Sequence, residues 1–477
     1  MADFELGSDE WFADHLLSGL AADYERLLKC YRYREGTNQL PAWGTGQSLS
    51  MYSQIIDLSR LNFAWQIVSA HVSRKELKSV RSAAATHEGD SVADELAFAS
   101  ALDLQFSDAM LSKGTYGRGY LTVSADETVE GPENVYLTAS DAWQTFALRD
   151  AKRPWLVRAA VTVGWDAVAS EDTVTLHRSA DGDSAGYSVQ WRAFRESGES
   201  TFPSPEDGVS SFSVVLDDGS WVKQPSVPYP EGQRCQVFEF STETGKGEFE
   251  RHYATLDRIN HTILQRVVIT VMQAFKQRAV AGDFPTEYPE NHPRAGETID
   301  YDELFKAGPD ALWFIPEGAK MWESAAVDIR PILDAVRDDL KMLASAASIP
   351  IYVLAPEAAG GSAEGARSAS ETQTRKTRRD ERRDKRVLAS VLSAEFRLLG
   401  DEARAVESKI EVEFEDSTLV SPFDRANVFK TLRDGGASRQ FALQRAYGLT
   451  SAQIQQEAAF AAREALQRGV LSGSGNS

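Results

Sequence analysis

Apolar residues recur at helical spacing in two separate stretches of the chain. They fall three or four positions apart from His252 to Val280, and again from Ala326 to Ala347. Residues at this spacing share one face of an α-helix, so each stretch predicts a helix with a single apolar stripe. The second helix should end before Ile349-Pro350, because a residue that precedes proline disfavours helical backbone angles. The stripes consist of Leu256, Ile259, Ile263, Val267, Val271 and Phe275, and of Ile329, Ile332, Val336, Leu340, Leu343 and Ala347.

The segment between these helices, residues 281–325, has the composition of a separate small module. Its recurring prolines prevent a continuous helix. Two short strands are predicted at Leu312–Phe314 and Lys320–Trp322, on either side of a turn at Pro316-Glu317-Gly318. The segment holds ten acidic residues against three basic ones. These features fit a helical hairpin with a decorated loop inside an α/β enzyme, and they fit equally a two-helix stem that carries a protruding module.

Upstream of these helices the pattern changes from helical to alternating. Helices are predicted at residues 8–35, with Ser8 as the N-cap, around Asn62–Val72, and from Asp90 to Lys113. Short β-rich runs separated by Gly, Asp and Ser follow between residues 115 and 250. These runs predict mostly antiparallel strands at Gly119–Val123, Val135–Thr138, Trp155–Val157, Val161–Val163, Asp172–Leu176, Tyr187–Trp191 and Cys235–Phe240.

The region between the last two predicted strands reads differently. Residues 196–232 are rich in Ser, Pro, Asp and Gly, so we expect a surface loop there. Helices and antiparallel strands that occupy different parts of a chain are typical of the α+β class. The sequence therefore predicts an α+β fold.

A loop of small residues and a strongly charged helix follow the second apolar helix. Ser368 with Glu371 is a capping-box pair, which predicts a helix that begins there and continues to Leu399. Within it, residues 375–386 carry eight bases and three acids. Such a face is either solvated, or it contacts phosphates or the acidic surface of a neighbouring subunit. Successive helical residues point about 100° apart, so these bases cannot all face one direction.

The chain is predicted to end in a strand and three helices. Lys409–Phe414 alternates as a half-buried strand should. Ser421-Pro422 reads as a cap followed by a first-turn proline, and Gly435-Gly436 reads as a helix stop. Thr450 with Gln453 is a second capping box. The Gly-Ser tail from Ser472 is expected to be disordered.

Charge and composition narrow the functional classes. The 477 residues carry a formal net charge of −20, which argues against static binding of nucleic acid, because such binding requires clustered Lys and Arg. Solubility alone also explains an acidic surface. No apolar run is long enough for a membrane span, and the acidic N-terminus is unlike a signal peptide. The two cysteines, Cys30 and Cys235, give no disulfide framework and no metal-ligand spacing, and a reducing compartment suits them.

Catalytic motifs are missing from the sequence. Thr244-Gly245-Lys246-Gly247 lacks the spacing of a phosphate loop, and Glu364 stands where a nucleophile elbow requires glycine. The seven histidines are scattered without metal-ligand spacing. We expect no cofactor, no metal and no enzymatic activity. A cytoplasmic hydrolase with an unrecognised active site remains the alternative, and a packaging ATPase is disfavoured by the missing phosphate loop.

The order of these parts resembles that of the portal proteins of tailed bacteriophages, the head-to-tail connector rings whose single chain runs wing, stem, clip, stem, wing and crown. The likeness covers nearly the whole chain and depends on the order and spacing of short motifs. They are Tyr31–Gly36 with Leu40-Pro41, Asn62–Val72, Gly117–Val123, Val237–Phe240, Leu256–Asn260, Ala311–Pro316, Leu343–Pro350 and the Ser-Ala-Glu-Gly-Ala element at 362–366.

The resemblance implies a portal-type fold with a helical stem, a small α/β clip, a mixed α/β wing and a C-terminal helical crown. Residues 1–250 would form the wing, 251–280 and 326–350 the stem helices, and 281–325 the clip. Residues 351–417 would hold the tunnel loop, the long tunnel helix and a strand returning to the wing, and 418–477 the crown and tail. The Ser/Asp-rich 196–232 loop is the main departure from the family pattern.

The resemblance also implies a function and partners. Such proteins form a homo-oligomeric ring, typically a dodecamer, at one capsid vertex of the virion, after assembly in the host cytoplasm. Double-stranded DNA passes through the ring without sequence specificity during packaging and ejection. The terminase large subunit, head–tail adaptor proteins, and the major capsid and scaffolding proteins would be partners, without a membrane.

Candidate site residues follow from the same likeness. Lumen-facing residues of the tunnel loop would be Ala358, Ala359, Gly360, Gly361, Ser362 and Glu364. The basic face of the tunnel helix, directed at DNA or a neighbouring subunit, would be Arg375, Lys376, Arg378, Arg379, Arg382 and Arg383. Docking residues for terminase or adaptor on the clip would be Tyr288, Glu290, Trp313, Phe314 and Lys320.

Overall fold

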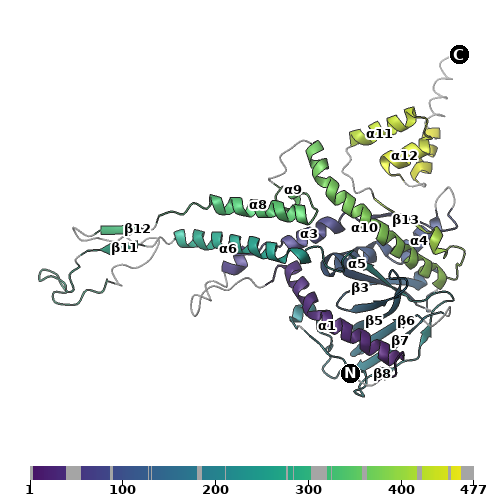
Figure 1. Cartoon of the computed structure of the whole chain (residues 1–477), viewed down its shortest axis with the longest axis horizontal. Coiled ribbons are helices and arrows are strands. Elements are labelled where there is room, and N and C mark those ends of the chain that lie inside the picture. Colours follow the sequence, from purple (N-terminus) through teal and green to yellow (C-terminus); the bar gives the residue numbers. More distant parts are fainter. Residues whose placement is uncertain are drawn as a thin grey trace, which may run out of the picture. The chain divides into compact units, whose positions relative to one another are not determined.

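A computed structural model gives the fold as α+β and divides the chain into two units (Figure 1). One unit comprises Met1–Asn38, Asn62–His252 and Ala344–Ser477, and the other comprises Gln39–Leu61 and Tyr253–Leu343. The structure describes residues 4–38, 55–85, 90–126, 128–129, 131–179, 185–209, 211–274, 278–282, 284–301, 320–323, 325–356, 363–415, 422–449 and 453–463.

The first unit begins with helix α1, Asp9–Glu35, as predicted. Ser8 caps it by accepting a hydrogen bond from the Trp11 backbone nitrogen at 3.1 Å. Gly36 ends it with a φ of 71°, a left-handed angle that glycine adopts without a steric penalty. Both ends of this helix were therefore readable from the sequence.

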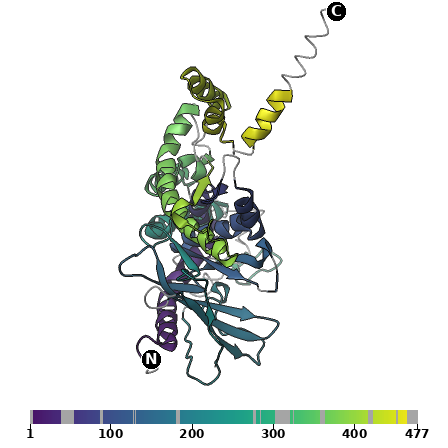
Figure 2. The same ribbon diagram turned by 90° about the vertical axis from the view of Figure 1, so that its right-hand side faces the viewer.

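An antiparallel six-stranded sheet packs against α1 (Figure 2). Leu16 and Leu20 of α1 are fully buried against Val161 and Leu176 of the sheet. The strands are β4 (Thr145–Arg149), β5 (Val157–Asp166), β6 (Glu171–Arg178), β7 (Tyr187–Phe194), β8 (Val222–Lys223) and β9 (Val227–Pro228), with both β8 and β9 paired to β7. The run predicted at 161–163 lies in β5, but of the run predicted at 155–157 only Val157 does, because β5 begins there; β4 was not predicted.

The stretch 196–232 is not simply the surface loop that its polar composition predicts. Phe212 and Trp221 pack against the core of the six-stranded sheet, and Leu216 is buried in it. Asp172 of β6 is fully buried and accepts hydrogen bonds from the Ser200 and Thr201 hydroxyls, each at 2.6 Å. A few apolar residues spaced through a polar sequence therefore fix this segment to the sheet.

The first unit also contains a three-stranded antiparallel sheet in the order β10-β2-β3. Its strands are β2 (Arg118–Ala125), β3 (Val135–Asp141) and β10 (Val237–Ser241). The whole six-stranded sheet lies between β3 and β10 in the sequence. It is therefore an insertion into the smaller sheet.

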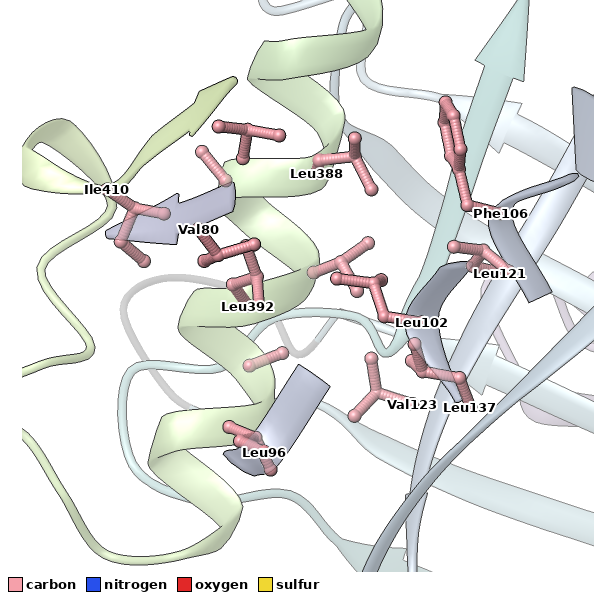
Figure 3. Close-up of a cluster of buried hydrophobic side chains, with 14 of the residues drawn as sticks. Val80, Leu96, Leu102, Phe106, Leu121, Val123, Leu137, Leu388, Leu392 and Ile410 are labelled. Atoms are coloured by element: carbon pink, nitrogen blue, oxygen red, sulfur yellow. The ribbon is translucent and has the colours of Figure 1, made fainter. Parts of the chain in front are cut away.

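Helices α4 (Ser91–Ala99), α5 (Leu102–Tyr116) and α10 (Ala363–Leu398) enclose the core beside this smaller sheet (Figure 3). Leu102 and Phe106 of α5 meet Leu388 and Leu392 of α10 there. The helix predicted from Asp90 to Lys113 is wrong as one element, because the chain breaks at Ala101, which has a left-handed φ of 52°. Asp90 caps α4 through the Ala93 backbone nitrogen.

Helix α3 (Phe63–Val72) lies in the same unit, with Asn62 as its N-cap. A two-stranded ladder joins β1 (Leu77–Arg81), which was not predicted, to β13 (Glu411–Phe414), which was. Helix α10 begins at Ala363, so the predicted start at Ser368 is wrong. The residues before Ser368 continue the helix, and a capping motif inside a longer helix has no end to cap. A short helix, α9 (Ile351–Leu354), precedes α10 within the segment expected to be a loop.

The described C-terminal residues are helical. Helix α11 spans Pro422–Asp434, α12 spans Arg439–Tyr447, and residues 453–463 form a third helix. Helix α11 ends directly before the predicted stop, Gly435-Gly436, in which Gly436 has a φ of 84°. The predicted caps Ser421 and Thr450 lie outside the described residues.

The second unit is built on helices α6 (Tyr253–Ala274) and α8 (Arg330–Ala346). The last three residues of α8, from Ala344, belong to the first unit. The two helices run antiparallel, because Arg258 near the start of α6 pairs with Asp339 in the second half of α8 at 2.8 Å, and Gln273 near the end of α6 donates a hydrogen bond to the Val327 carbonyl oxygen before α8 at 2.9 Å. Strands β11 (Arg278–Ala281) and β12 (Lys320–Glu323) pair antiparallel between them. Helix α6 therefore ends before the predicted Val280, because the backbone there bonds to β12 instead.

Candidate functional site

Helix α10 changes character along its length. Its second half carries the apolar side chains Leu388, Val391 and Leu392, which lie in the core. The inward face of its first half is polar, with Gln373, Thr377, Asp380, Glu381 and Asp384 buried. Charge pairs must therefore hold the first half in place.

The deepest of these pairs centre on Asp384. Its carboxylate oxygens accept hydrogen bonds from Lys113 Nζ of α5 at 2.5 Å and from Lys75 Nζ, just after α3, at 3.0 Å. All three side chains are less than a tenth exposed. Burial alone would raise the pKa of Asp384, but the two ammonium groups outweigh it and lower the pKa. Burial lowers the pKa of Lys113, whereas Asp384 and Asp380 raise that of Lys75 despite its burial.

A second buried cluster joins Lys376 of α10 to Glu248 and His71. Lys376 Nζ bonds to the Glu248 carboxylate. His71 Nε2 lies 3.0 Å from the Ala347 carbonyl oxygen and 3.2 Å from Lys376 Nζ. Burial lowers the pKa of His71 to about 4, although Glu248 opposes the shift, so the ring is neutral near pH 7. A neutral Nε2 either donates to the carbonyl or accepts from the ammonium, and it cannot do both.

The outward face of α10 carries the remaining predicted basic residues. Arg379 and Arg383 both approach the Glu243 carboxylate, at 3.1 and 3.6 Å, and Arg375 pairs with Glu371 at 2.5 Å. Arg378 and Arg382 are exposed. The sequence led us to expect that some of these bases pair with a neighbouring subunit. Within the single chain, three of the six, Lys376, Arg379 and Arg383, pair with acids distant in the sequence.

A hollow of about 580 Å³ lies beside α10, bounded by β10 and the segment 153–157. We call it the arginine groove, after its lining residues Arg149, Arg153, Arg234, Arg383, Arg386 and Arg397. The Arg386 guanidinium carbon lies 4.7 Å from the centre of the Trp155 ring, a cation–π contact. The sequence placed Trp155 only in a predicted strand, Trp155–Val157, and gave no sign of a role at a site.

The other predicted site residues lie elsewhere or outside the described residues. Ala358, Ala359, Gly360, Gly361 and Ser362 of the expected tunnel loop, and Trp313 and Phe314 of the expected clip, are outside them. Glu364 belongs to the first turn of α10.

Three of the predicted clip residues are described. The Tyr288 ring stacks on His292 at 4.3 Å between centroids, and the Arg294 guanidinium lies 5.3 Å from the same ring. Glu290 and Lys320, the latter on β12, are exposed. Tyr288 is therefore the one described clip candidate with an ordered set of neighbouring side chains.

Sequence reasoning found the basic residues of α10 and missed their partners. Asp380 and Asp384 are four residues apart among bases, the one sequence signal that could have indicated an inward acidic face. Lys75, Lys113, His71 and Glu248 gave no signal, because each stands in a different element. Among the residues the structure describes, no group of three His, Cys, Asp or Glu side chains could hold a metal ion. No helix in these residues has the length and apolar character needed to span a membrane.

Comparisons with known proteins give structural likenesses, two of them to chains from the neck of GTA particles. No protein-family model matches the sequence, and no curated protein matches it. A chain from the neck of an empty GTA particle computed with C6 symmetry is similar at 12% identity and a TM-score of 0.47, over 89% of this chain and 93% of that one. A chain from the neck of a native GTA particle computed with C12 symmetry is similar at 12% identity and a TM-score of 0.42, over 88% of this chain and 98% of that one.

Proposed function

We propose that this chain is the portal subunit of a tailed-phage-like particle, a ring-forming head-to-tail connector through which double-stranded DNA is packaged and ejected. The observation that carries the proposal is the second unit, in which helices α6 and α8 run antiparallel and continue into the β11–β12 ladder. In this proposal α6 and α8 are the stem, and the residues between them are the clip. The long charged helix α10 is the tunnel helix.

Incomplete burial of the helix pair supports packing against further copies. Leu256, Ile259 and Ile263 of α6 are buried, but Val267 and Val271 are only half-buried. Met342 of α8 is 63% exposed and Val327, just before α8, is 52% exposed. Apolar side chains that one hairpin leaves partly exposed gain stability when neighbouring subunits cover them. A ring of subunits provides such neighbours on both sides.

The remaining parts of the proposal come from the family likeness of the sequence. The particle would contain the ring at one capsid vertex, with capsid and scaffolding proteins around it. The terminase large subunit and then the head–tail adaptors would dock on the clip, where Tyr288, Glu290 and Lys320 are the described candidates. The chain would carry out no catalysis and would need no cofactor, and the hydrolysis that drives packaging would belong to the terminase.

Mass and shape of the purified protein test this proposal together. We expect light scattering to give a mass near a dozen times the 52.5 kDa subunit, and electron micrographs to show rings with an open centre in end-on views. An ATPase assay on the purified protein should give no activity. A monomer that persists at high concentration, or particles without a central channel, would contradict the proposal.

A further inference from the structure

The arginine groove carries more positive charge than its own acids neutralise. Arg149 pairs with Glu239 at 2.5 Å, and Arg383 approaches Glu243 at 3.6 Å. The third surface acid of the lining, Glu407, accepts a hydrogen bond from the Ser390 hydroxyl at 2.9 Å. Glu239 and Glu243 are therefore paired with arginines, whereas Glu407 keeps its charge and can offset one arginine of the lining at most.

Three arginines of the groove form no salt bridge with a carboxylate among the described residues. Arg153 is exposed on the segment that follows β4, and Arg386 lies over the Trp155 ring. Arg397 bonds only to neutral groups, the Gly232 carbonyl oxygen at 3.3 Å and the Gln233 side-chain oxygen at 3.0 Å. In a chain with a net charge of −20, this excess of cations in one hollow needs an anionic partner to explain it.

The floor of the groove is apolar. Leu156, Phe238 and Val387 line it, all partly exposed. At the rim, Trp155 is 52% exposed and the Arg386 contact holds a flat aromatic surface beside the floor. A large aromatic side chain and arginines around an apolar hollow are the residue types that dominate binding energy at protein interfaces.

We propose that the arginine groove binds an acidic protein segment that inserts one apolar side chain between Trp155 and the floor. Carboxylates on either side of that anchor would pair with Arg153, Arg386 and Arg397. Arginine suits this role, because its planar guanidinium can bind a carboxylate through two parallel hydrogen bonds. The inserted side chain would cover the apolar floor that a chain of charges alone would leave exposed.

A protein segment fits the groove better than nucleic acid does. Duplex DNA carries one charge per about 1.7 Å of its axis, so it would extend far beyond a hollow of this size onto a predominantly acidic chain. A peptide with a few carboxylates needs only the arginines of the groove. The inference does not depend on the proposed function, because a single chain holds the complete groove.

Fluorescence anisotropy on the full chain tests the proposal. The probe is a fluorescein-labelled peptide of alternating aspartate and glutamate with one central phenylalanine. The same peptide with serine in place of the phenylalanine, and a labelled oligothymidylate, serve as comparison probes. We expect the phenylalanine peptide to bind most tightly and its affinity to fall as salt rises.

Variants locate the binding site. Trp155→Ala should weaken binding of the phenylalanine peptide about tenfold or more, since truncation of an aromatic anchor removes most of its contact. Arg153→Glu and Arg386→Glu should weaken binding of both peptides, and Arg153→Glu changes an exposed side chain that the fold does not need. Arg192→Glu, an exposed arginine on β7 outside the groove, is the matched control and should leave binding unchanged.

The outcomes separate the alternatives. Tighter binding of the oligothymidylate than of either peptide would assign the groove to nucleic acid and overturn the proposal. Equal affinity for the phenylalanine and serine peptides would contradict the proposed insertion of an apolar side chain. Unchanged affinity in Trp155→Ala and Arg153→Glu would place peptide binding elsewhere on the chain.

Discussion

Glu395 is a carboxyl group inside the apolar core. It is fully buried on α10 between Ala394 and Phe396, and neither of its carboxyl oxygens has a hydrogen-bond partner within the described part of the chain. Burial raises its pKa to about 8, while the nearby Ser100 hydroxyl opposes the shift. The folded protein therefore holds this group protonated at pH 7, whereas the unfolded chain ionises it above about pH 4.5.

Replacement of Glu395 by glutamine should stabilise the protein at neutral and alkaline pH. Because the folded pKa exceeds the unfolded one, the wild-type protein loses stability as pH rises from about 4.5 to 8 and no further above that range. Glu395→Gln removes this loss, so its melting temperature should depend less on pH and exceed that of the wild type at pH 8. Thermal melts across this range measure the effect, with exposed Glu402→Gln as the control. Parallel pH profiles for wild type and Glu395→Gln would show that the group does not titrate as argued.

Asp384 shows the opposite case, a buried charge that its neighbours require. Asp384→Asn keeps the side-chain size but leaves Lys75 and Lys113 buried without their shared carboxylate. Removal of one partner from a buried pair costs about 3–5 kcal/mol, so the melting temperature should fall by many degrees. Asp334→Asn, in an exposed pair with Arg337 on α8, should change it little. Equal effects of the two substitutions would contradict a special role for the buried cluster.

Elements followed the sequence where one periodic stripe or one cap decided them. Helix α1, with Ser8 before it and Gly36 after it, formed within the predicted limits. Prediction failed where partners distant in sequence decided the outcome. Residues 278–281 left the helix to pair with β12, and β1 formed only because β13 lies beside it.

The candidate site shows the same division. The bases of α10 were visible as a local concentration of charge, whereas the acids that pair with them, Glu243 and Glu248, follow β10. The lysines that pair with Asp384 lie after α3 and in α5. A charge pair between distant elements leaves no periodicity in the sequence. Its existence could therefore be expected, but its members could not be named.

The break between α4 and α5 gives a prediction at this scale. Ala101 holds a left-handed φ of 52°, where a side chain is strained. Ala101→Gly should therefore stabilise the protein by about 1 kcal/mol, seen as a higher melting temperature. Ala97→Gly is the same chemical change inside α4, and it should destabilise by about the same amount. A loss of stability in both variants would mean that the break carries no strain.

At the scale of the whole molecule, the net charge of −20 predicts a mainly acidic surface. Exposed apolar or basic groups are exceptions on such a surface, and each of them is a candidate contact for a partner. Met342 is such a group on the helix pair, and Trp155 is one on the arginine groove. The proposed ring assigns the first to neighbouring subunits. The proposed binding of an acidic protein segment in the arginine groove would cover Trp155.

An acidic substitution at Met342 should therefore affect assembly and not folding. Met342→Asp changes a side chain that is 63% exposed in the single chain, so the helix content should stay unchanged. If copies pack over this position, the buried charge would shift light-scattering mass from the ring toward smaller species. Thr270→Asp, at an exposed position on α6, is the control for added charge. Intact rings from Met342→Asp would place the contact between subunits elsewhere.

The chain passes from β3 into the six-stranded sheet and returns from it into β10. In the smaller sheet β3 and β10 lie on either side of β2. Residues Asp141 and Val237, at the two junctions, pair with Gly119 and Thr122 of that one strand. The roughly 95 residues between them therefore start and finish two strand spacings apart across the sheet and three residues apart along it, about 14 Å in all. A cassette with such close ends can be exchanged between related chains without disturbing its host. Yet α1 covers its apolar face. If the six-stranded sheet were exchanged without α1, Leu16 and Leu20 of α1 would lose the surface that buries them. We therefore expect α1 and the six-stranded sheet to be inherited together.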